Sequence, residues 1–368
     1  MITEKIYKLT NAGKVQEWSV EVNGNLFRVI SGQTDGKKVV NAWTTCEGKN
    51  IGKANETSPE DQAMKEALAL REKKLEQGGY HDDVANIAIP KYIQPMLAKK
   101  FEGKMPEITY SQPKLDGIRC IVNKDGMWSR KGKPIMGAPH IFRSLSGLFR
   151  LRPTAIFDGE LYNHELKDDF NKIASMVKKQ KPNEMDLLES EEKCQYWVYD
   201  FPEEAEFSFG TRFNTIQHML NNYEHIVVVP TMAIREQDRD HLDEVYQVYL
   251  RQGYEGQMVR DGMMPYELNK RSKGLLKRKE FFDAEFEIVR INEGMGNWAG
   301  HGKSVTLMNT DGGTFDAGLK GNKEYAATVL SNKDRFIGCE ATVRYQNLTP
   351  DGIPRFGIVY TIHETPRM

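Results

Sequence analysis

Cysteine is scarce in this 368-residue sequence, and long apolar runs are missing. The four cysteines lie more than 70 residues apart, with neither the CxxC spacing of zinc sites nor a dense disulfide pattern, so we expect reduced thiols. No apolar run reaches the roughly 18 residues that cross a bilayer, and residues 1–15 lack the apolar core of a signal peptide. We therefore expect an intracellular, cytoplasmic protein with no membrane segment.

The sequence also lacks an excess of charge of either sign. Lysine and arginine total 51 against 52 acidic residues, so any surface that binds a polyanion must arise from segregated charge. The hydrophobic fraction of 39% and charged fraction of 28% are typical of a globular chain, and its length allows two or three domains.

Two common site motifs are absent. The eight histidines show no HExxH or HxxxH spacing, which argues against a zinc hydrolase. The segment GMGNWAGHGKS, residues 294–304, looks like a phosphate-binding P-loop, but Asn297 stands where that motif needs its first glycine. We also expect no helix after Ser304, so a P-loop is excluded.

Turn signals and hydrophobic patterns divide the chain into three parts. Residues 1–88 contain strand-like runs broken by Asn-Gly and Asp-Gly turns, then a helix with Ser58 as N-cap, Pro59 at its first position and Gly78-Gly79 after its end. Residues 89–282, entered through prolines 90 and 95, alternate strands and helices. Residues 283–368 contain five short strands with glycine-rich turns, which indicates a small β-barrel. The fold class is α+β and multidomain.

The stretch YSQPKLDGIRCIV, residues 110–122, places charged residues in an otherwise apolar strand pattern. Asp116-Gly117 is a turn signal, so we place Lys114 and Arg119 on one hairpin, with residues 118–122 paired to 127–131. A free lysine has a pKa of about 10.4 and is a poor nucleophile unless its surroundings lower that value. Lys114 is therefore a candidate nucleophile only if other groups activate it.

Further cations follow at strand spacing. Lys277 and Lys279, in LLKRK, point to one face of an extended run. Together with Arg119 and Lys114 they would repel each other unless an anion lies among them, and a nucleotide phosphate suits this position.

Carboxylates and an aromatic strand complete the set. FDGELY supplies Asp158 and Glu160, YEGQMVR supplies Glu255, and we place these acids at strand ends. Separate carboxylates suit a nucleotide-bound Mg²⁺, and the ring of Tyr199 in YWVYDF could stack on a base. Each motif alone is more often a solvated turn, a surface strand or part of a core.

In their order, however, the motifs resemble those of the covalent nucleotidyltransferase superfamily, specifically ATP-dependent DNA ligases. The resemblance covers roughly residues 90–368 and includes QPMLA upstream, WSRKGKPI after the lysine motif, and residues 292–318 as the start of an OB domain. It implies an ATP-grasp-like nucleotidyltransferase core of antiparallel sheets and helices, followed by an OB-fold barrel.

The resemblance also implies roles. Lys114 would attack ATP and carry AMP, and Lys277 and Lys279 would neutralise the α-phosphate in the transition state. ATP and Mg²⁺ (or Mn²⁺) would be the cofactors, and nicked duplex DNA the partner of a monomeric enzyme. The remaining implied contacts are with ribose or phosphates (Arg119, Glu160), adenine (Tyr199, Gln112), metal (Glu160, Glu255) and DNA (Ser129, Arg130).

The sequence departs from the family at two places. Gln112 stands where many members have glutamate, so we expect adenine to be recognised partly by the backbone. The C-terminal stretch, residues 352–368, lacks the family's basic Arg-x-Asp-Lys motif, and either Arg355 or no residue takes its role.

Other functions stay open at this stage. RNA ligases and GTP-dependent capping guanylyltransferases also use a KxDG lysine, although the OB-like segment and WSRKGK favour DNA ligase. An NAD⁺-dependent ligase is disfavoured by chain length and by the missing four-cysteine cluster. A non-catalytic nucleic-acid-binding protein of this architecture is the alternative from another class.

Residues 1–88 resemble WGR-like modules more loosely. They contain 12 basic and 13 acidic residues, so a DNA-binding role requires one basic face. A module that contacts protein or only stabilises the chain is the competing interpretation.

Overall fold

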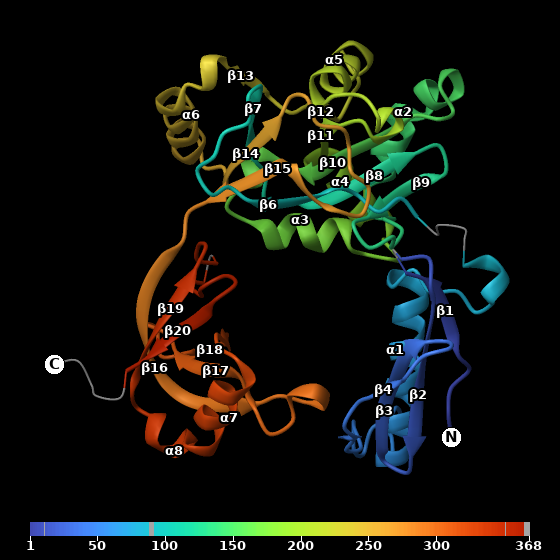
Figure 1. Cartoon of the computed structure of the whole chain (residues 1–368), viewed down its shortest axis with the longest axis vertical. Coiled ribbons are helices and arrows are strands. Elements are labelled where there is room, and N and C mark those ends of the chain that lie inside the picture. The colour runs from blue at the N-terminus through green and yellow to red at the C-terminus, as the bar shows by residue number, and fades with distance from the viewer. Residues whose placement is uncertain (11, 88–91, 350, 364–368) are drawn as a thin grey trace. The chain divides into compact units, whose positions relative to one another are not determined.

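The computed structural model describes residues 1–10, 12–87, 92–349 and 351–363. Residues 92–280 form one compact unit (Figure 1), and residues 1–91 and 281–368 precede and follow it in the chain. The predicted boundary at 88/89 and Pro90 lie outside the described residues, so the three-part division stays a prediction. None of the helices formed by the described residues is long and apolar enough to cross a membrane. The four cysteines, all within the described ranges, are buried and free, as predicted.

The N-terminal segment has its own core. An antiparallel sheet packs Trp18 and Val20 against Ala63 and Ala67 of helix α1. The predicted helix signals are confirmed, because Ser58 accepts a hydrogen bond from the Asp61 N–H and the helix ends before Gly78. The elements are β1 Ile6–Leu9, β2 Val15–Asn23, β3 Leu26–Gln33, β4 Val39–Val40, β5 Thr44–Thr45, α1 Pro59–Gln77 and the 3₁₀ turn Val84–Asn86.

Two five-stranded sheets form the framework of residues 92–280. The first has the order β13-β7-β14-β15-β6, and the second has the order β12-β11-β10-β8-β9. The first contains β6 Leu97–Lys100, β7 Thr109–Lys114, β13 Met232–Ile234, β14 Gly256–Asp261 and β15 Arg271–Lys279. The second contains β8 Ile118–Asn123, β9 Gly126–Ser129, β10 Ile156–Tyr162, β11 Gln195–Asp200 and β12 Ile226–Val228.

Helices pack against both sheets. α6 contacts β14 and β7 of the first sheet, while α5 contacts β11 and α3 contacts β10 and β8 of the second (Figure 1). The helices are α2 Pro139–Leu151, α3 Phe170–Val177, α4 Glu184–Lys193, α5 Phe209–Met219 and α6 Arg239–Arg251, with 3₁₀ turns at His164–Leu166, Pro202–Glu204 and Arg235–Gln237. The alternation of strands and helices predicted for residues 89–282 is confirmed over the described part of this range.

The predicted pairing of residues 118–122 with residues 127–131 is confirmed, but the placement of Lys114 on the same hairpin as Arg119 is wrong. β7 pairs with β13 and β14, whereas β8 pairs with β10 and, as predicted, with β9. The Asp116-Gly117 step therefore carries the chain from one sheet to the other. Gly117 is required for a close approach, since a Cβ there would lie 2.4 Å from the Leu161 carbonyl oxygen. The predicted position of Asp158 and Glu160 at a strand end is also wrong, because both lie inside β10.

The C-terminal segment forms the predicted small barrel. Its five strands close in the order β16-β17-β18-β20-β19 around buried residues such as Val305, Leu307 and Val343. The sequence did not predict the two helices that follow β18, of which α7 packs against β17 and β16. The elements are β16 Phe282–Glu293, the 3₁₀ turn Gly296–Trp298, β17 Gly302–Met308, β18 Thr314–Leu319, α7 Lys323–Ser331, α8 Lys333–Phe336, β19 Glu340–Tyr345 and β20 Ile358–Ile362. A strand, not a helix, contains Ser304, which agrees with the exclusion of a P-loop.

Candidate active site

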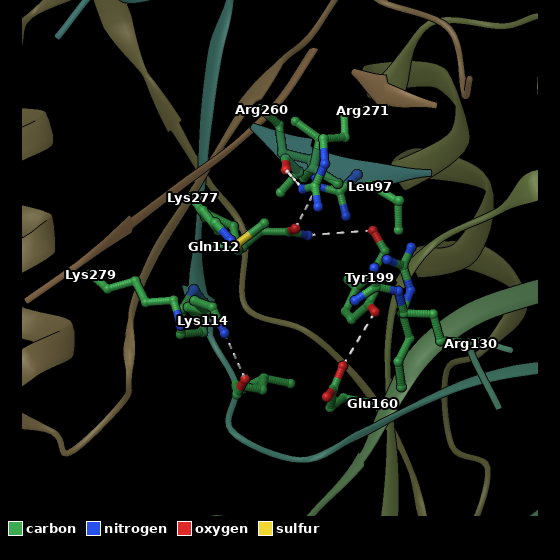
Figure 2. Close-up of a pocket in the computed structure, with 16 residues that line it drawn as sticks. Leu97, Gln112, Lys114, Arg130, Glu160, Tyr199, Arg260, Arg271, Lys277 and Lys279 are labelled. Atoms are coloured by element: carbon green, nitrogen blue, oxygen red, sulfur yellow. Dashed lines mark hydrogen bonds between the residues drawn. The ribbon is translucent and has the colours of Figure 1, made fainter. Parts of the chain in front are cut away.

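A cavity of about 310 Å³ opens between the two sheets of residues 92–280. Strands β6, β7, β14 and β15 of the first sheet form one wall, and β8, β10 and β11 of the second sheet contribute to the opposite wall. Figure 2 shows Lys114, Lys277 and Lys279 on one side, facing Glu160, Tyr199 and Arg130. The lining residues are Leu97, Ala98, Gln112, Pro113, Lys114, Leu115, Arg119, Arg130, Glu160, Tyr199, Met258, Arg260, Arg271, Leu275, Lys277 and Lys279.

The register of the first sheet brings the distant lysines together. Lys114 lies opposite Gly256, which lies opposite Lys279 on β15. The neighbouring row is Gln112, Met258 and Lys277. Residues aligned across strands have adjacent side chains, so the lysine motif and LLKRK share one surface although more than 160 residues separate them. The prediction that Lys277 and Lys279 face the same way is confirmed.

A carboxylate of the protein lies among these lysines. Glu255 forms ion pairs with Lys114 and, at 2.5 Å, with Lys279. Its side chain is only 11% exposed, and it directly precedes β14. Burial favours the neutral acid, but the ammonium groups of Lys114 and Lys279 prevail and hold the pKa of Glu255 below its ordinary value. The negative charge that the sequence assigned to a nucleotide is thus supplied here by Glu255.

Lys277 and Lys279 lie close to other positive charges. Burial, followed by the charges of Lys279 and Lys114, lowers the pKa of Lys277. Burial also lowers the pKa of Lys279, with Glu255 opposing the shift. Like charges held this close favour an anionic ligand, because a phosphate would relieve their repulsion.

Arg119 reaches the cavity from the second sheet. Its guanidinium donates two hydrogen bonds to Asp158, at 2.9 and 2.5 Å, and the Tyr266 hydroxyl donates a third to the same carboxylate at 2.7 Å. Asp158 is 1% exposed, so this buried pair fixes the arginine plane beside the ring of Tyr199. Asp158 therefore positions Arg119 and does not line the cavity itself.

Glu160 and Tyr199 lie side by side on adjacent strands. The Tyr199 hydroxyl donates to Glu160 Oε2 at 3.3 Å (Figure 2). Burial raises the pKa of Glu160 to about 7, against the lowering effect of Lys114 and Arg119, while Asp158 and Glu255 add to the rise. A carboxylate with this pKa changes its charge near neutral pH.

Gln112 is fixed at both ends of its amide. Its Oε1 accepts from Arg260 Nε at 2.7 Å, and its Nε2 donates to Thr231 Oγ1 at 2.8 Å. Arg260 is paired in turn with Asp200, a fully buried residue that also binds Arg212. Because the Gln112 side chain is occupied, a base near it would have to use the backbone or other side chains.

The two residues assigned to DNA occupy different positions. Arg130 lines the cavity, directly after β9. Ser129 does not line it, and its hydroxyl accepts the backbone N–H of Lys133 at 2.9 Å. Arg355, the candidate for the missing basic motif, lies in the connection between β19 and β20, and its role stays a prediction.

Three polar or flexible side chains among the lining residues that the sequence did not predict are Met258, Arg260 and Arg271. The sequence EGQMVR could have indicated Met258 and Arg260, because residues two positions apart in a strand point to the same face. Arg271 opens β15, on which Lys277 and Lys279 lie, and donates to the Ala98 carbonyl at 3.0 Å. The lining of the cavity combines seven cationic side chains, the ring of Tyr199 and the carboxyl group of Glu160, which suits a phosphorylated aromatic ligand.

Comparison with known proteins identifies the family. The model of the ATP-dependent DNA ligase domain matches residues 95–279, half of the chain and nearly the whole of the two-sheet unit. A DNA ligase of African swine fever virus is 26% identical over 346 residues, covering 84% of this chain and 76% of the viral one. A DNA ligase of bacteriophage T4 is 24% identical over 327 residues, covering 69% and 64%.

Solved structures show the same fold. One from a structure-function study of Lig E DNA ligases has a TM-score of 0.62 and 23% identity, and covers 74% of this chain and 100% of that one. Another, named Pmar-Lig_Pre., has a TM-score of 0.62 and 19% identity, and covers 82% and 80%. The family match spans the strands that carry Lys114, Glu160, Tyr199 and Lys279, and the chain belongs to the family of ATP-dependent DNA ligases.

Proposed function

We propose that this ligase seals nicks in duplex DNA through an AMP group carried on Lys114. The observation that carries the proposal is the cavity between the sheets, where Lys114, Lys277 and Lys279 share a wall opposite Tyr199 and Glu160. The three lysines would attract the negative charge of a triphosphate, and the ring of Tyr199 would stack on a base.

In the first step the ammonium of Lys114 gives up a proton to solvent, and its neutral Nζ attacks the α-phosphorus of ATP; a second proton leaves this nitrogen as the phosphoramide forms. A nitrogen–phosphorus bond forms, the bond from phosphorus to the leaving oxygen breaks, and pyrophosphate departs. Lys114 must first leave the Glu255 carboxylate, and the incoming triphosphate supplies the replacing negative charge. Lys277 and Lys279 then neutralise charge that develops on the α-phosphate, so positioning and electrostatics do most of the catalysis.

The base would lie between Tyr199 and Met258. The tyrosine comes from the second sheet and the methionine from the first, and both line the cavity. Arg119, held by Asp158, would contact the ribose or a phosphate. The polar ends of Gln112 are occupied, which supports recognition of adenine partly through the backbone.

The carboxylates present fit a magnesium ion. Mg²⁺ in nucleotide sites needs one or two protein carboxylates together with phosphate oxygens, and Glu160 and Glu255 would supply these carboxylates. Their mutual repulsion, which contributes to the raised pKa of Glu160, is what a divalent cation would relieve. When bound, the ion would screen phosphate charge and orient the triphosphate.

The later steps use DNA. AMP passes from Lys114 to a 5′-phosphate at the nick, and the 3′-hydroxyl then displaces AMP as the new phosphodiester bond forms. Arg130 and Ser129 would contact DNA near the cavity mouth, and the C-terminal barrel would bind the duplex mainly through phosphates, with strong salt dependence. The enzyme would act as a monomer.

Labelled nucleotides test this function. The protein is incubated with α-labelled ATP, GTP or NAD⁺ and Mg²⁺; one part of the reaction is resolved on a denaturing gel, and other parts are given nicked DNA or nicked RNA. We expect the protein to become labelled with ATP but not with GTP or NAD⁺, and to release the labelled AMP when nicked DNA is added and sealed. Label from GTP alone would indicate a capping enzyme, sealing restricted to RNA would indicate an RNA ligase, and no label would leave a non-catalytic nucleic-acid-binding protein.

The N-terminal segment has a separate proposed role. We propose that residues 1–88 act as a WGR-like module that adds affinity for duplex DNA, supported by their separate hydrophobic core. Deleting them should weaken nick binding and reduce its dependence on salt, while AMP labelling of Lys114 serves as the folding control. Unchanged affinity and salt dependence would favour a protein-contact or stabilising role.

A further inference from the structure

A buried cluster of two arginines and one aspartate adjoins the part of the cavity wall that contains Gln112 and Tyr199. Asp200, Arg212 and Arg260 are 0%, 1% and 2% exposed. Arg212 donates to both carboxylate oxygens of Asp200, at 2.7 and 3.2 Å, and Arg260 donates to Asp200 Oδ2 at 2.5 Å. One carboxylate therefore serves two guanidinium groups.

The two arginines differ in what else they contact. Arg212 donates its remaining hydrogen bonds to the carbonyl oxygens of Phe207 and Met264, away from the lining residues. Arg260 instead lines the cavity, and its Nε donates to Gln112 Oε1 at 2.7 Å (Figure 2). Arg260 is thus the member of the cluster that connects it to the nucleotide site.

Gln112 connects Arg260 to the strand that contains Tyr199. Its side chain is 1% exposed, and the bond from Arg260 to Oε1 leaves Nε2 directed at Thr231 Oγ1 and, at 3.5 Å, at the Tyr199 carbonyl oxygen. The guanidinium carbon of Arg260 also lies 5.5 Å from the centre of the Tyr199 ring. Arg260 therefore contacts both Gln112 and Tyr199, which come from different sheets.

We propose that Arg260 is a positioning residue for the base: it orients the amide of Gln112 and the ring of Tyr199, and through them sets the affinity for ATP. This inference rests on the proposed nucleotide function of the cavity. A planar guanidinium can donate from Nε and Nη1 to two acceptors in fixed directions, which the single ammonium of a lysine cannot reproduce. Arginine is therefore required here, and positive charge alone is insufficient.

A matched pair of substitutions separates positioning from stability. R260K and R212K both replace an arginine on Asp200 with lysine and both keep the charge. R260K should raise the KM for ATP in Lys114 labelling by about tenfold, which corresponds to 1.4 kcal/mol, with kcat changed less than twofold. R212K should leave the KM unchanged while lowering the melting temperature at least as much as R260K does.

A double mutant tests the route through Gln112. In a Q112M background the amide is gone, so R260K should add less than twofold to the KM. Full additivity of the two effects would contradict positioning through Gln112. Equal KM values for R260K and R212K, or a loss of kcat without a change in KM, would overturn the proposal.

Calorimetric titration of ATP into K114A variants gives a readout that does not depend on ligation. ATP binding to K114A that weakens about tenfold in K114A/R260K, but not in K114A/R212K, supports the inference. If K114A, K114A/R260K and K114A/R212K bind ATP equally, the positioning role of Arg260 is refuted, although the cavity is still a nucleotide site. No binding of ATP even by K114A would refute the proposed nucleotide function itself.

Discussion

Lys114 and Arg119, five residues apart in the chain, belong to different sheets and reach one cavity from opposite walls. The crossing at Gly117 makes this possible, because a glycine lets the chain pass against the Leu161 carbonyl. The KxDGxR motif therefore spans the cavity, with the proposed nucleophile on one sheet and a fixed cation on the other.

Glu255 should contribute to the stability of the nucleotide-free enzyme. In E255Q the ammonium groups of Lys114 and Lys279 lose the carboxylate that they share, so we expect a loss of about 2 kcal/mol in the free energy of unfolding. Urea denaturation measures it. E280Q, an exposed glutamate that directly follows β15, is the control and should change stability by less than about 0.5 kcal/mol. Equal stabilities of E255Q and wild type would show that the ion pairs contribute nothing.

Glu160 should make stability depend on pH. Its pKa is about 7 in the folded protein, above the value of about 4.3 for an exposed glutamate. The folded state therefore binds the proton more tightly, and the contribution of Glu160 to stability is complete below pH 4.3 and is lost as the pH rises through 7. From pH 5 to 8, the unfolding free energy of wild type should fall relative to that of E160Q. Parallel curves for the two proteins would contradict the assigned shift.

Tyr199 should act through its ring more than through its hydroxyl. Y199A removes the surface on which a base would stack, and stacking on an aromatic side chain is worth about 1–3 kcal/mol, so we expect the KM for ATP to rise about 5- to 150-fold. Y199F keeps the ring and loses only the hydrogen bond to Glu160, so its KM should rise less than about threefold. If Y199F were as impaired as Y199A, the hydroxyl and not the ring would be the important group.

Lys277 should affect the rate of AMP transfer. Removing a cation that acts on transition-state charge costs about 10²-fold or more in kcat, so K277A should label with AMP at least 100 times more slowly at saturating ATP. K273A is the matched control, because Lys273 lies on the same strand, is exposed and does not line the cavity. Single-turnover labelling measures both variants, and similar rates for the two would remove Lys277 from the transition state.

The sequence predicted the elements better than their assembly. Ser58 and Gly78 locate α1, and the spacing of Lys277 and Lys279 gives their shared face, because these are local signals. The pairing of β7 with β14 joins residues that are far apart in the chain, and no local pattern reveals it. The Asp-Gly step at residue 117 looked like a hairpin turn because the same dipeptide serves a tight turn and a close crossing.

The candidate site shows the same division. Lys114, Glu160, Tyr199 and Lys279 were predicted because their motifs carry charge or aromatic groups in a recognisable order, and all four line the cavity. The ion pairs of Glu255 and the bond from Arg260 to Gln112 depend on strand register between distant segments. Such contacts cannot be predicted without the fold. Glu255 supplies a negative charge among the lysines, and Arg260 holds the amide of Gln112.

The central claim is that Lys114 carries AMP, and mass spectrometry of the protein after incubation with ATP and Mg²⁺ tests it most directly. The account predicts one adduct with the mass of an adenylyl group on the peptide that contains Lys114, lost on addition of nicked DNA and absent from K114R. An adduct on another residue, or one that persists in K114R, would contradict it.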